Sequence, residues 1–262
     1  MKIAFIGAGR LATHLSAALM QAGHDIVQVY SRTMQSATAV ATLAGGAPTD
    51  DLSRLTMNAD VYIFAVSDAA LPELIPQVCK GREQKVMLHT AGSMAMDVFR
   101  GMALHYGVLY PMQTFSKERS VDFSQIPCFV EFNDELAQEN VSLLAHSVSR
   151  DVRQLSSDDR RYLHLAAVFA CNFANHCYAL AAELLECHGI GFDVMLPLID
   201  ETAAKVHTLS PEQAQTGPAV RYDENVIRTQ SQMLRDDPMT KEIYERMSLN
   251  IYKHAGRVFQ TK

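Results

Sequence analysis

The first residues whose types and spacing could do chemistry are Gly7, Ala8, Gly9, Arg10, Leu11 and Ala12, a G-x-G-x-x-A pattern. The pattern follows a short apolar run and opens a stretch with apolar residues at helical spacing. In such a loop the first glycine permits a tight turn, the second lets the backbone approach a pyrophosphate, and a small third residue lets helix and strand pack closely. The helix N-terminus adds free N–H groups and partial positive charge. We therefore expect Gly7 to Leu11 to bind a dinucleotide.

A second loop, Ser31-Arg32-Thr33, follows the next strand-like run. An acidic residue about twenty residues after the glycine loop would hydrogen-bond the ribose 2′-hydroxyl and repel a 2′-phosphate. Here the chain offers two hydroxyls and a guanidinium instead, which together can hold a 2′-phosphate. Arg32 could also be a solvated loop cation. We predict NADP, rather than NAD, as the cofactor.

Polar residues also stand where two further strands should end. In an open parallel sheet, ligands bind beyond the carboxyl ends of the strands. Val66 and Ser67 are therefore expected to face the nicotinamide half of the cofactor, and Ser93 is a substrate-side candidate. Ser67 and Asp68 are equally suited to cap the helix that begins near Leu71. His89 is either a site residue or a buried structural histidine.

A long apolar helix from Arg160 to His188 carries His164, Asn172 and Asn175. On a regular helix His164 and Asn175 differ by only about 20° in direction, and Asn172 lies about 80° away. Buried and unpaired, each would cost roughly 1 to 3 kcal/mol, so each should be bonded to protein or to ligand. Only His164 can transfer a proton near neutral pH. We predict His164 as the acid/base, Asn172 and Asn175 as positioning residues, and His89 as the next catalytic candidate.

Two loops supply further substrate-binding candidates. Gln113 belongs to Tyr110-Pro-Met-Gln-Thr114, where Tyr and Met are also ordinary packing residues. Thr216 and Arg221 lie between two predicted helices, and Arg221 can bind a substrate carboxylate or form a salt bridge with Asp223. No metal site is expected, because the spacing of the histidines and cysteines on the long helix fits no usual ligand set.

The elements that must position these residues change character along the chain. The strand-like runs are Lys2 to Ile6, Ile26 to Tyr30, Asp60 to Val66, Lys85 to Thr90, Gly107 to Tyr110, Cys128 to Phe132 and Val152 to Leu155. Helical patterns alternate with them, which predicts a parallel sheet with crossover helices. Beyond Ser156 the patterns are all helical, with expected helices at 160–188, 193–208, 224–235 and 239–256. We therefore expect a dinucleotide-binding domain over residues 1–155 and a helical domain over 156–262.

Composition excludes several function classes. With 262 residues, 48% hydrophobic and 20% charged, the chain is a folded protein. A net charge of -6 without a basic patch disfavours nucleic acid. Five cysteines with no C-x-x-C pair suit a reducing compartment, so we expect a cytoplasmic protein. We expect no membrane partner, because no apolar stretch looks able to span a bilayer. The apolar long helix predicts a homodimer formed through the helical domain.

The motifs resemble those of NADP oxidoreductases of the Rossmann-like type, which are similar to pyrroline-5-carboxylate reductases and to the β-hydroxyacid dehydrogenases related to 6-phosphogluconate dehydrogenase. The glycine loop, Ser31-Arg32-Thr33 and Ala65-Val66-Ser67-Asp68 carry this resemblance. A tighter resemblance is to a bacterial family with a helical C-terminal domain of unknown function. It rests on His89-Thr-Ala-Gly-Ser93, Tyr110-Pro-Met-Gln-Thr114, the segment from His164 to His176, and Thr216-Gly-Pro218 with Arg221 and Asp223.

The resemblance implies an α/β Rossmann domain followed by an all-α domain similar to the 6-phosphogluconate dehydrogenase C-terminal domain. It implies hydride transfer between NADP(H) and a small carbonyl, imine or hydroxy-acid substrate. Related hydroxyacid dehydrogenases carry a Lys on the corresponding helix, whereas this helix has none on its inner stretch. Either His164 replaces that lysine or the chemistry differs. The alternative function is a non-catalytic, NADP-binding redox-sensing or regulatory module.

Overall fold

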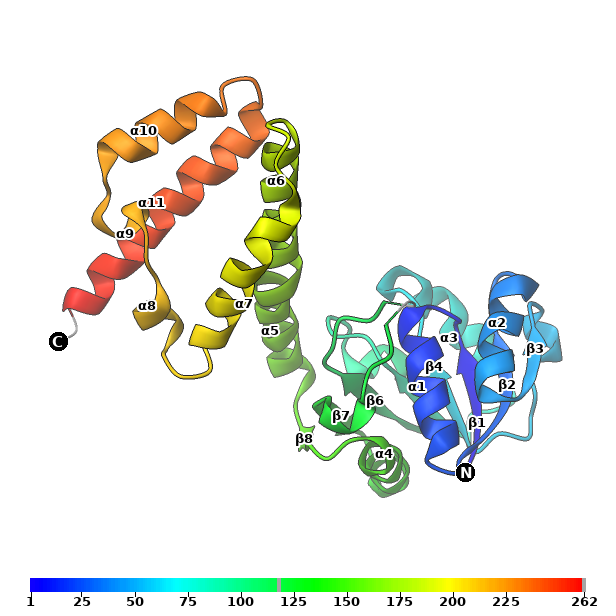
Figure 1. Cartoon of the computed structure of the whole chain (residues 1–262). Helices are drawn as coiled ribbons and strands as arrows, with labels where there is room; N and C mark the ends of the chain where they lie inside the picture. Colours follow the sequence, from blue (N-terminus) through cyan, green and yellow to red (C-terminus); the bar gives the residue numbers. More distant parts are fainter. Residues whose placement is uncertain (117–118, 261–262) are drawn as a thin grey trace. The chain divides into compact units, whose positions relative to one another are not determined.

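The computed structural model describes residues 1–116 and 119–260 (Figure 1). The chain forms two compact units, Met1–Cys171 and Asn172–Lys262. The first unit is built on a single sheet, and the second is helical (Figure 1). The predicted order, an α/β dinucleotide-binding domain followed by helices, is confirmed.

The sheet of the first unit has eight strands within the described residues. In spatial order they are β3 (Ala47–Thr49), β2 (Asp25–Tyr30), β1 (Lys2–Ile6), β4 (Val61–Phe64), β5 (Val86–His89), β6 (His105–Pro111), β7 (Cys128–Phe132) and β8 (Val152–Gln154). Neighbouring strands are parallel except β6 and β7, which are antiparallel. The order reverses at β1, so the crevice beside β1 and β4 is where ligands bind in such sheets. Only β3 was missing from the predicted strands.

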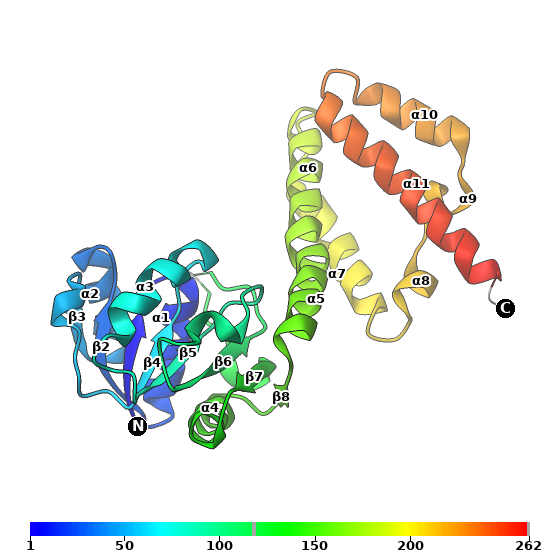
Figure 2. The ribbon, with the colours of Figure 1, turned by 180° about the vertical axis from the view of Figure 1, so that it is seen from behind.

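Helices cover both faces of this sheet. Helices α1 (Arg10–Gln21), α2 (Met34–Ala44) and α4 (Glu135–Val148) pack on one face, and α3 (Leu71–Cys79) packs on the other, which Figure 2 shows from behind. Successive residues of a strand point to opposite faces, so Ile3 and Phe5 join the first core while Ala4 and Ile6 join the second. Burial on both faces explains why these strands read as continuous apolar runs.

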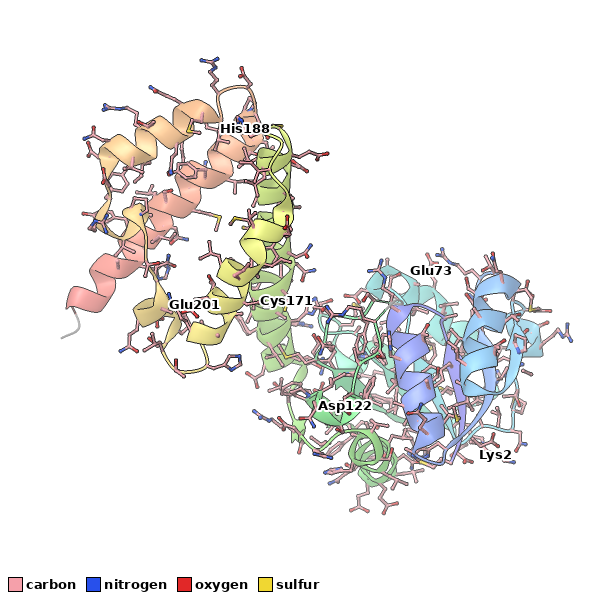
Figure 3. All side chains as sticks on the ribbon, viewed as in Figure 1. Lys2, Glu73, Asp122, Cys171, His188 and Glu201 are labelled. Atoms are coloured by element: carbon pink, nitrogen blue, oxygen red, sulfur yellow. The ribbon has the colours of Figure 1, made fainter. Side chains whose placement is uncertain are left out.

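The long helix begins at Ser157 and is continuous to Glu186, as α5 (Ser157–Ala167), a π-helical turn (Val168–Phe173) and α6 (Ala174–Glu186). Ser156 caps it, because its Oγ accepts the N–H of Asp159 at 3.1 Å. The two units divide within this helix at Cys171, which is labelled in Figure 3. The sequence placed the domain boundary at residue 155, where the strand pattern stops. The contacts place it later because the first turns of α5 are bonded to the sheet unit.

By length and composition the helix Ser157–Glu186 could also cross a membrane, with a mean hydropathy of 1.3 over its most apolar window. We expected no stretch of this kind from the sequence, yet this helix meets the criteria of length and composition because its apolar residues outweigh its scattered polar ones. The same composition occurs in helices of soluble proteins that are covered by other helices.

The second unit contains α6 and, after it, helices of different lengths. They are α7 (Leu196–Lys205), α8 (Pro211–Ala214), α9 (Pro218–Arg221), α10 (Glu224–Met233) and α11 (Pro238–Gln260). The helix expected over 193–208 begins instead with a 3-10 turn, Phe192–Met195. The loop expected around Thr216 contains α9, which is held by the packing of Tyr222 on Tyr252, with ring centroids 4.9 Å apart.

Candidate active site

The glycine loop joins β1 to α1 in a conformation that needs glycine. Gly7 has a φ of 114°, and a Cβ there would lie 2.3 Å from the carbonyl oxygen of Ala65. Gly9 is the N-cap of α1 and has no side chain to accept the first N–H groups of the helix. A Cβ built on Gly9 would meet nothing within 4 Å. The backbone of the loop is therefore open to a ligand at the N-terminus of α1. An uncapped helix start beside two glycines fits a pyrophosphate, and Ala8, Arg10 and Leu11 lie at this opening.

In the loop after β2, two of the three residues predicted to bind a 2′-phosphate have side chains available to do so. The hydroxyl of Thr33 is already engaged, because it caps α2 by accepting the N–H of Ser36 and also donates to Ser36 Oγ at 2.9 Å. Arg32 is exposed and makes no hydrogen bond or ion pair with the described residues. Ser31 is half-buried, with its backbone N–H bonded to Thr49. The arrangement leaves the side chains of Ser31 and Arg32 available for a 2′-phosphate, whereas Thr33 serves the helix.

At the end of β4, Val66 is partly buried and packs on the core, and Ser67 begins a 3-10 helix, Asp68–Ala70, without a side-chain cap. The carboxylate of Asp68 accepts a hydrogen bond from the hydroxyl of Ser93 beyond the neighbouring strand β5. The side chains of Ser67 and Asp68 make no capping hydrogen bond to α3, which begins after Ala70. The bond to Ser93 ties Asp68 to the segment after β5, and Ser67 remains a site candidate by its position alone.

His164 lies against the segment that follows β5. Its Nδ1 is 3.1 Å from the hydroxyl of Tyr110 on β6. A Cβ added at Gly92 would come within 2.5 Å of the same nitrogen, so the imidazole rests directly on the backbone of Gly92. His164, Gly92, Ser93 and Asp68 therefore gather beyond the carboxyl ends of β4 and β5. Parallel sheets present their ligands at this edge.

A buried polar network fixes the start of α5 on the sheet. Arg160 is 0% exposed, and its Nη1 lies 2.5 Å from Glu131 Oε2 on β7. Its Nη2 donates to the carbonyl of Met94 at 2.6 Å. Glu131 also accepts the backbone N–H and the hydroxyl of Ser157 at 2.9 and 2.7 Å. Because His164 follows Arg160 by one helical turn, this network sets the position of the imidazole.

Arg161 brings a cation to the same place. Its Nε donates to the carbonyl oxygen of Ser93 at 3.2 Å, and its Nη1 lies 3.2 Å from Asp158. The sequence did not point to Arg161, and it placed Tyr110 in a candidate substrate-side segment or in the core without linking it to His164. The motif around Tyr110 was visible, but nothing in the sequence paired that strand with the long helix. The pairing comes from β6 lying beside β5 in the sheet.

His89 ends β5 but does not reach the surface. It is 0% exposed, accepts the N–H of Ala91 at 3.1 Å, and lies beside the ring of Phe99 with centroids 5.8 Å apart. Burial, followed by the charge of Arg160, lowers the pKa of His89 to about 3. A histidine in this setting stays neutral and enclosed. It fits a structural role better than contact with substrate.

Asn172 and Asn175 are both exposed, at the start of the second unit. The π-helical turn accommodates about one extra residue, which rotates everything after it by about 100° relative to a regular helix. His164 and Asn175 then differ by about 80° in direction, so the narrow shared face expected of a regular helix is lost. The sequence pattern did not predict this π-helical turn. Such turns often occur at functional sites.

The remaining predicted substrate-binding residues, Gln113, Thr216 and Arg221, are all described and make no hydrogen bond to His164. Gln113 is exposed, and its Oε1 accepts the N–H of the next residue at 2.8 Å. Arg221, at the end of α9, is exposed and forms no ion pair with Asp223, which instead caps α10. Thr216 belongs to the second unit, where it lines a pocket of about 320 Å³ with residues of α9, α10 and α11. Within residues 1–116 and 119–260, no cluster of His, Cys, Asp or Glu is suited to a metal ion.

Comparisons with known proteins agree with this architecture. Residues 2–91 match the family described as "NADP oxidoreductase coenzyme F420-dependent", and residues 126–251 match the "Domain of unknown function (DUF2520)". No curated protein matches the chain significantly. The fold is similar to that of an imine reductase from Myxococcus stipitatus in complex with NADP+, with 17% identity, a TM-score of 0.65, and 100% and 95% of the two chains covered.

A pyrroline-5-carboxylate reductase from Coxiella burnetii also shares the fold, with 16% identity, a TM-score of 0.58 and 97% of each chain covered. A much nearer structure is that of a "putative NADP oxidoreductase" from Bacteroides fragilis. It is 51% identical, with a TM-score of 0.93, over 96% of this chain and 98% of that one. At such identity over the full length, this chain belongs to the same family of NADP oxidoreductases as the Bacteroides fragilis protein.

Proposed function

We propose that this protein reduces a small substrate at a C=N or C=O bond with NADPH and that His164 supplies the proton. The observation that carries the proposal is the position of His164, which rests on Gly92 beyond the carboxyl end of β5. The open helix start at Gly9 and the unengaged guanidinium of Arg32 support NADP as the cofactor. When bound, the reduced nicotinamide supplies the hydride.

His164 suits the proton-transfer role for chemical reasons. As the carbon of a C=N or C=O group is reduced, basicity or negative charge develops on the attached heteroatom, so a donor must already stand within hydrogen-bond reach. An imidazolium can give up its proton near neutral pH, whereas the asparagine amides can only orient or polarise. The half-buried ring of His164 is held on one edge by Tyr110. Its other edge is left for the substrate.

The charge beside His164 favours an imine over a ketone. The Asp68 carboxylate is exposed at the same strand ends and is oriented by the hydroxyl of Ser93. When His164 protonates the imine nitrogen, the resulting iminium is cationic and accepts the hydride more readily; a carboxylate stabilises that cation but gives no such advantage to a neutral ketone. Arg161 is drawn toward Asp158 and the Ser93 carbonyl, so its charge is partly balanced.

We also propose that the functional form is a cytoplasmic homodimer. In the single chain, none of the residues of α6, all of which are described, is buried. Along the long helix, Tyr162 is 75% exposed, Leu165 52% and Leu184 47%. Covering such a helix with a second copy would bury apolar side chains at roughly 25 cal/mol per Å². The cysteines of the chain are all free, which supports a reducing compartment.

A substrate screen tests the proposed reaction. Purified protein is incubated with NADPH and a panel of cyclic and acyclic imines, ketones and keto acids, and the loss of NADPH absorbance is followed. We expect turnover of at least one imine, with slower or no turnover of the matching ketone and a strong preference for NADPH over NADH. NADPH binding without turnover of any panel member would favour the regulatory alternative. Turnover of ketones alone would contradict the role given to Asp68.

A further inference from the structure

We infer that Tyr110 is a positioning residue that holds Nδ1 of His164 and thereby assigns the exchangeable proton to Nε2. The inference rests on the proposed role of His164 as proton donor. The two side chains come from different elements, β6 and α5. Their hydrogen bond, 3.1 Å from Oη to Nδ1, is the side-chain contact that ties the imidazole to the sheet.

Tyr110 is well placed to act as a fixed partner. It is 9% exposed, on a strand with neighbours on both sides. Its ring lies edge-on to the imidazole, with centroids 6.2 Å apart, and packs beside Phe129 at 6.5 Å. Burial raises the pKa of Tyr110, so the phenol stays protonated at neutral pH. A neutral hydroxyl held in this way cannot turn far from His164.

Gly92 closes the other side of the same nitrogen. A Cβ at this position would lie 2.5 Å from Nδ1 and 2.7 Å from Cγ of His164. The Nδ1 edge of the ring is therefore enclosed between the Gly92 backbone and the Tyr110 hydroxyl. Nε2 lies on the opposite edge and has no hydrogen-bond partner among the described residues. The geometry leaves Nε2 as the atom that faces a reacting group.

A hydroxyl suits this role because it can both accept and donate. When the imidazole is protonated, the Tyr110 oxygen accepts the Nδ1–H. The proton on Nε2 passes to the substrate heteroatom, the N–H bond breaking as the new N–H or O–H bond forms. The ring is left neutral with its proton on Nδ1, still bonded to Tyr110. Solvent then reprotonates Nε2, and the ring need not rotate during the cycle.

The direct test is the ¹⁵N chemical shift of the His164 ring nitrogens by NMR, which needs no substrate. The Tyr110→Phe variant should move the Nδ1 signal toward that of an unpartnered nitrogen. Tyr106→Phe is the matched control, because Tyr106 is 8% exposed on the same strand and its hydroxyl contacts Asp97. It should leave the His164 signals unchanged. An unchanged Nδ1 shift in Tyr110→Phe would overturn the inference even if the enzyme is active.

A double-mutant cycle then separates positioning from direct catalysis. Tyr110→Phe should lower imine turnover by about three- to tenfold, the range of one hydrogen bond, with NADPH affinity unchanged. In a His164→Ala background the same change should have no further effect, because Tyr110 acts through His164. Losses that multiply instead would show that Tyr110 contacts the substrate on its own and would overturn the positioning role. Gly92→Ala, which displaces the imidazole, should reproduce the altered Nδ1 signal.

Discussion

Arg160 and Glu131 join helix α5 to strand β7 through a buried ion pair, with Nη1 and Oε2 2.5 Å apart. The guanidinium is buried in the sheet unit, and the other carboxylate oxygen of Glu131, Oε1, accepts the backbone N–H of Ser157. His164 stands one turn beyond this anchor. The position of the proposed proton donor is thus set by a buried ion pair one turn earlier on the same helix.

Arg160→Met should therefore destabilise the sheet unit strongly. Removing one partner of a buried pair leaves the other charge uncompensated, which costs about 3 to 5 kcal/mol. The measurement is urea unfolding, followed by circular dichroism. Arg153→Met is the control, because Arg153 pairs with Asp151 on the surface, with 64% of its side chain exposed. It should cost less than about 1 kcal/mol. Equal losses for the two variants would contradict the anchoring role.

Arg32→Ala should weaken NADPH binding by about one to two decades and leave NADH nearly unchanged. A charge-assisted hydrogen bond to the 2′-phosphate contributes roughly 1.5 to 3 kcal/mol, and NADH has no such phosphate. Isothermal titration with both cofactors measures the difference. Arg150→Ala, which removes another exposed arginine of the same unit, should bind both cofactors as the parent does. The clamp assignment fails if Arg32→Ala loses affinity equally for NADPH and NADH.

Light scattering at micromolar concentration should give the mass of two chains. Leu184→Glu should shift the protein toward monomer, because it places a charge on the apolar surface of α6 that the second copy would cover. Leu43→Glu is the matched control on α2, where the leucine is 55% exposed. It should leave the mass unchanged. A parent protein that is already monomeric would refute the homodimer.

His89 predicts a loss of stability in acid. Its pKa is lowered in the folded state to about 3, from the ordinary 6.5, so below pH 6.5 the unfolded chain binds the additional proton. The stability that depends on a neutral His89 is complete above pH 6.5 and declines as the pH falls toward 3. His89→Asn keeps an acceptor for the Ala91 N–H but does not titrate. Urea unfolding at pH 7.5 and 4.5 should therefore show a smaller acid loss in this variant than in the parent, and an equal loss would be the contrary result.

Much of the fold could be predicted from the sequence, because the strands that carry the glycine loop and the site are apolar runs bounded by clear turn signals. Strand β3 escaped notice because Ala47-Pro48-Thr49 is too short for a periodic pattern and contains a proline. The helices of the second unit were visible from their caps and breakers. Their ends moved by a few residues, as is usual where a 3-10 turn opens a helix.

The candidate site was less predictable, because it depends on contacts between distant residues. The glycine loop, Arg32 and His164 could be found from spacing and chemistry. The contacts of Tyr110 with His164 and of Asp68 with Ser93 needed the strand order of the sheet. Thr33 was predicted to help bind the 2′-phosphate, but its hydroxyl caps α2. The π-helical turn, which redirects Asn172 and Asn175, has no signal in residue type or spacing.

The most direct test of the account compares NADPH oxidation by the parent, His164→Ala and His146→Ala, with an imine that the parent reduces. His146 is an exposed histidine on α4 whose Nδ1 is bonded to the carbonyl of Ser142 on the same helix, and its replacement should leave turnover unchanged. The account predicts that His164→Ala lowers kcat by roughly 10²-fold or more, the usual scale for a general acid, with NADPH affinity intact. A kcat within a factor of about three of the parent would contradict the assignment of His164 as the proton donor.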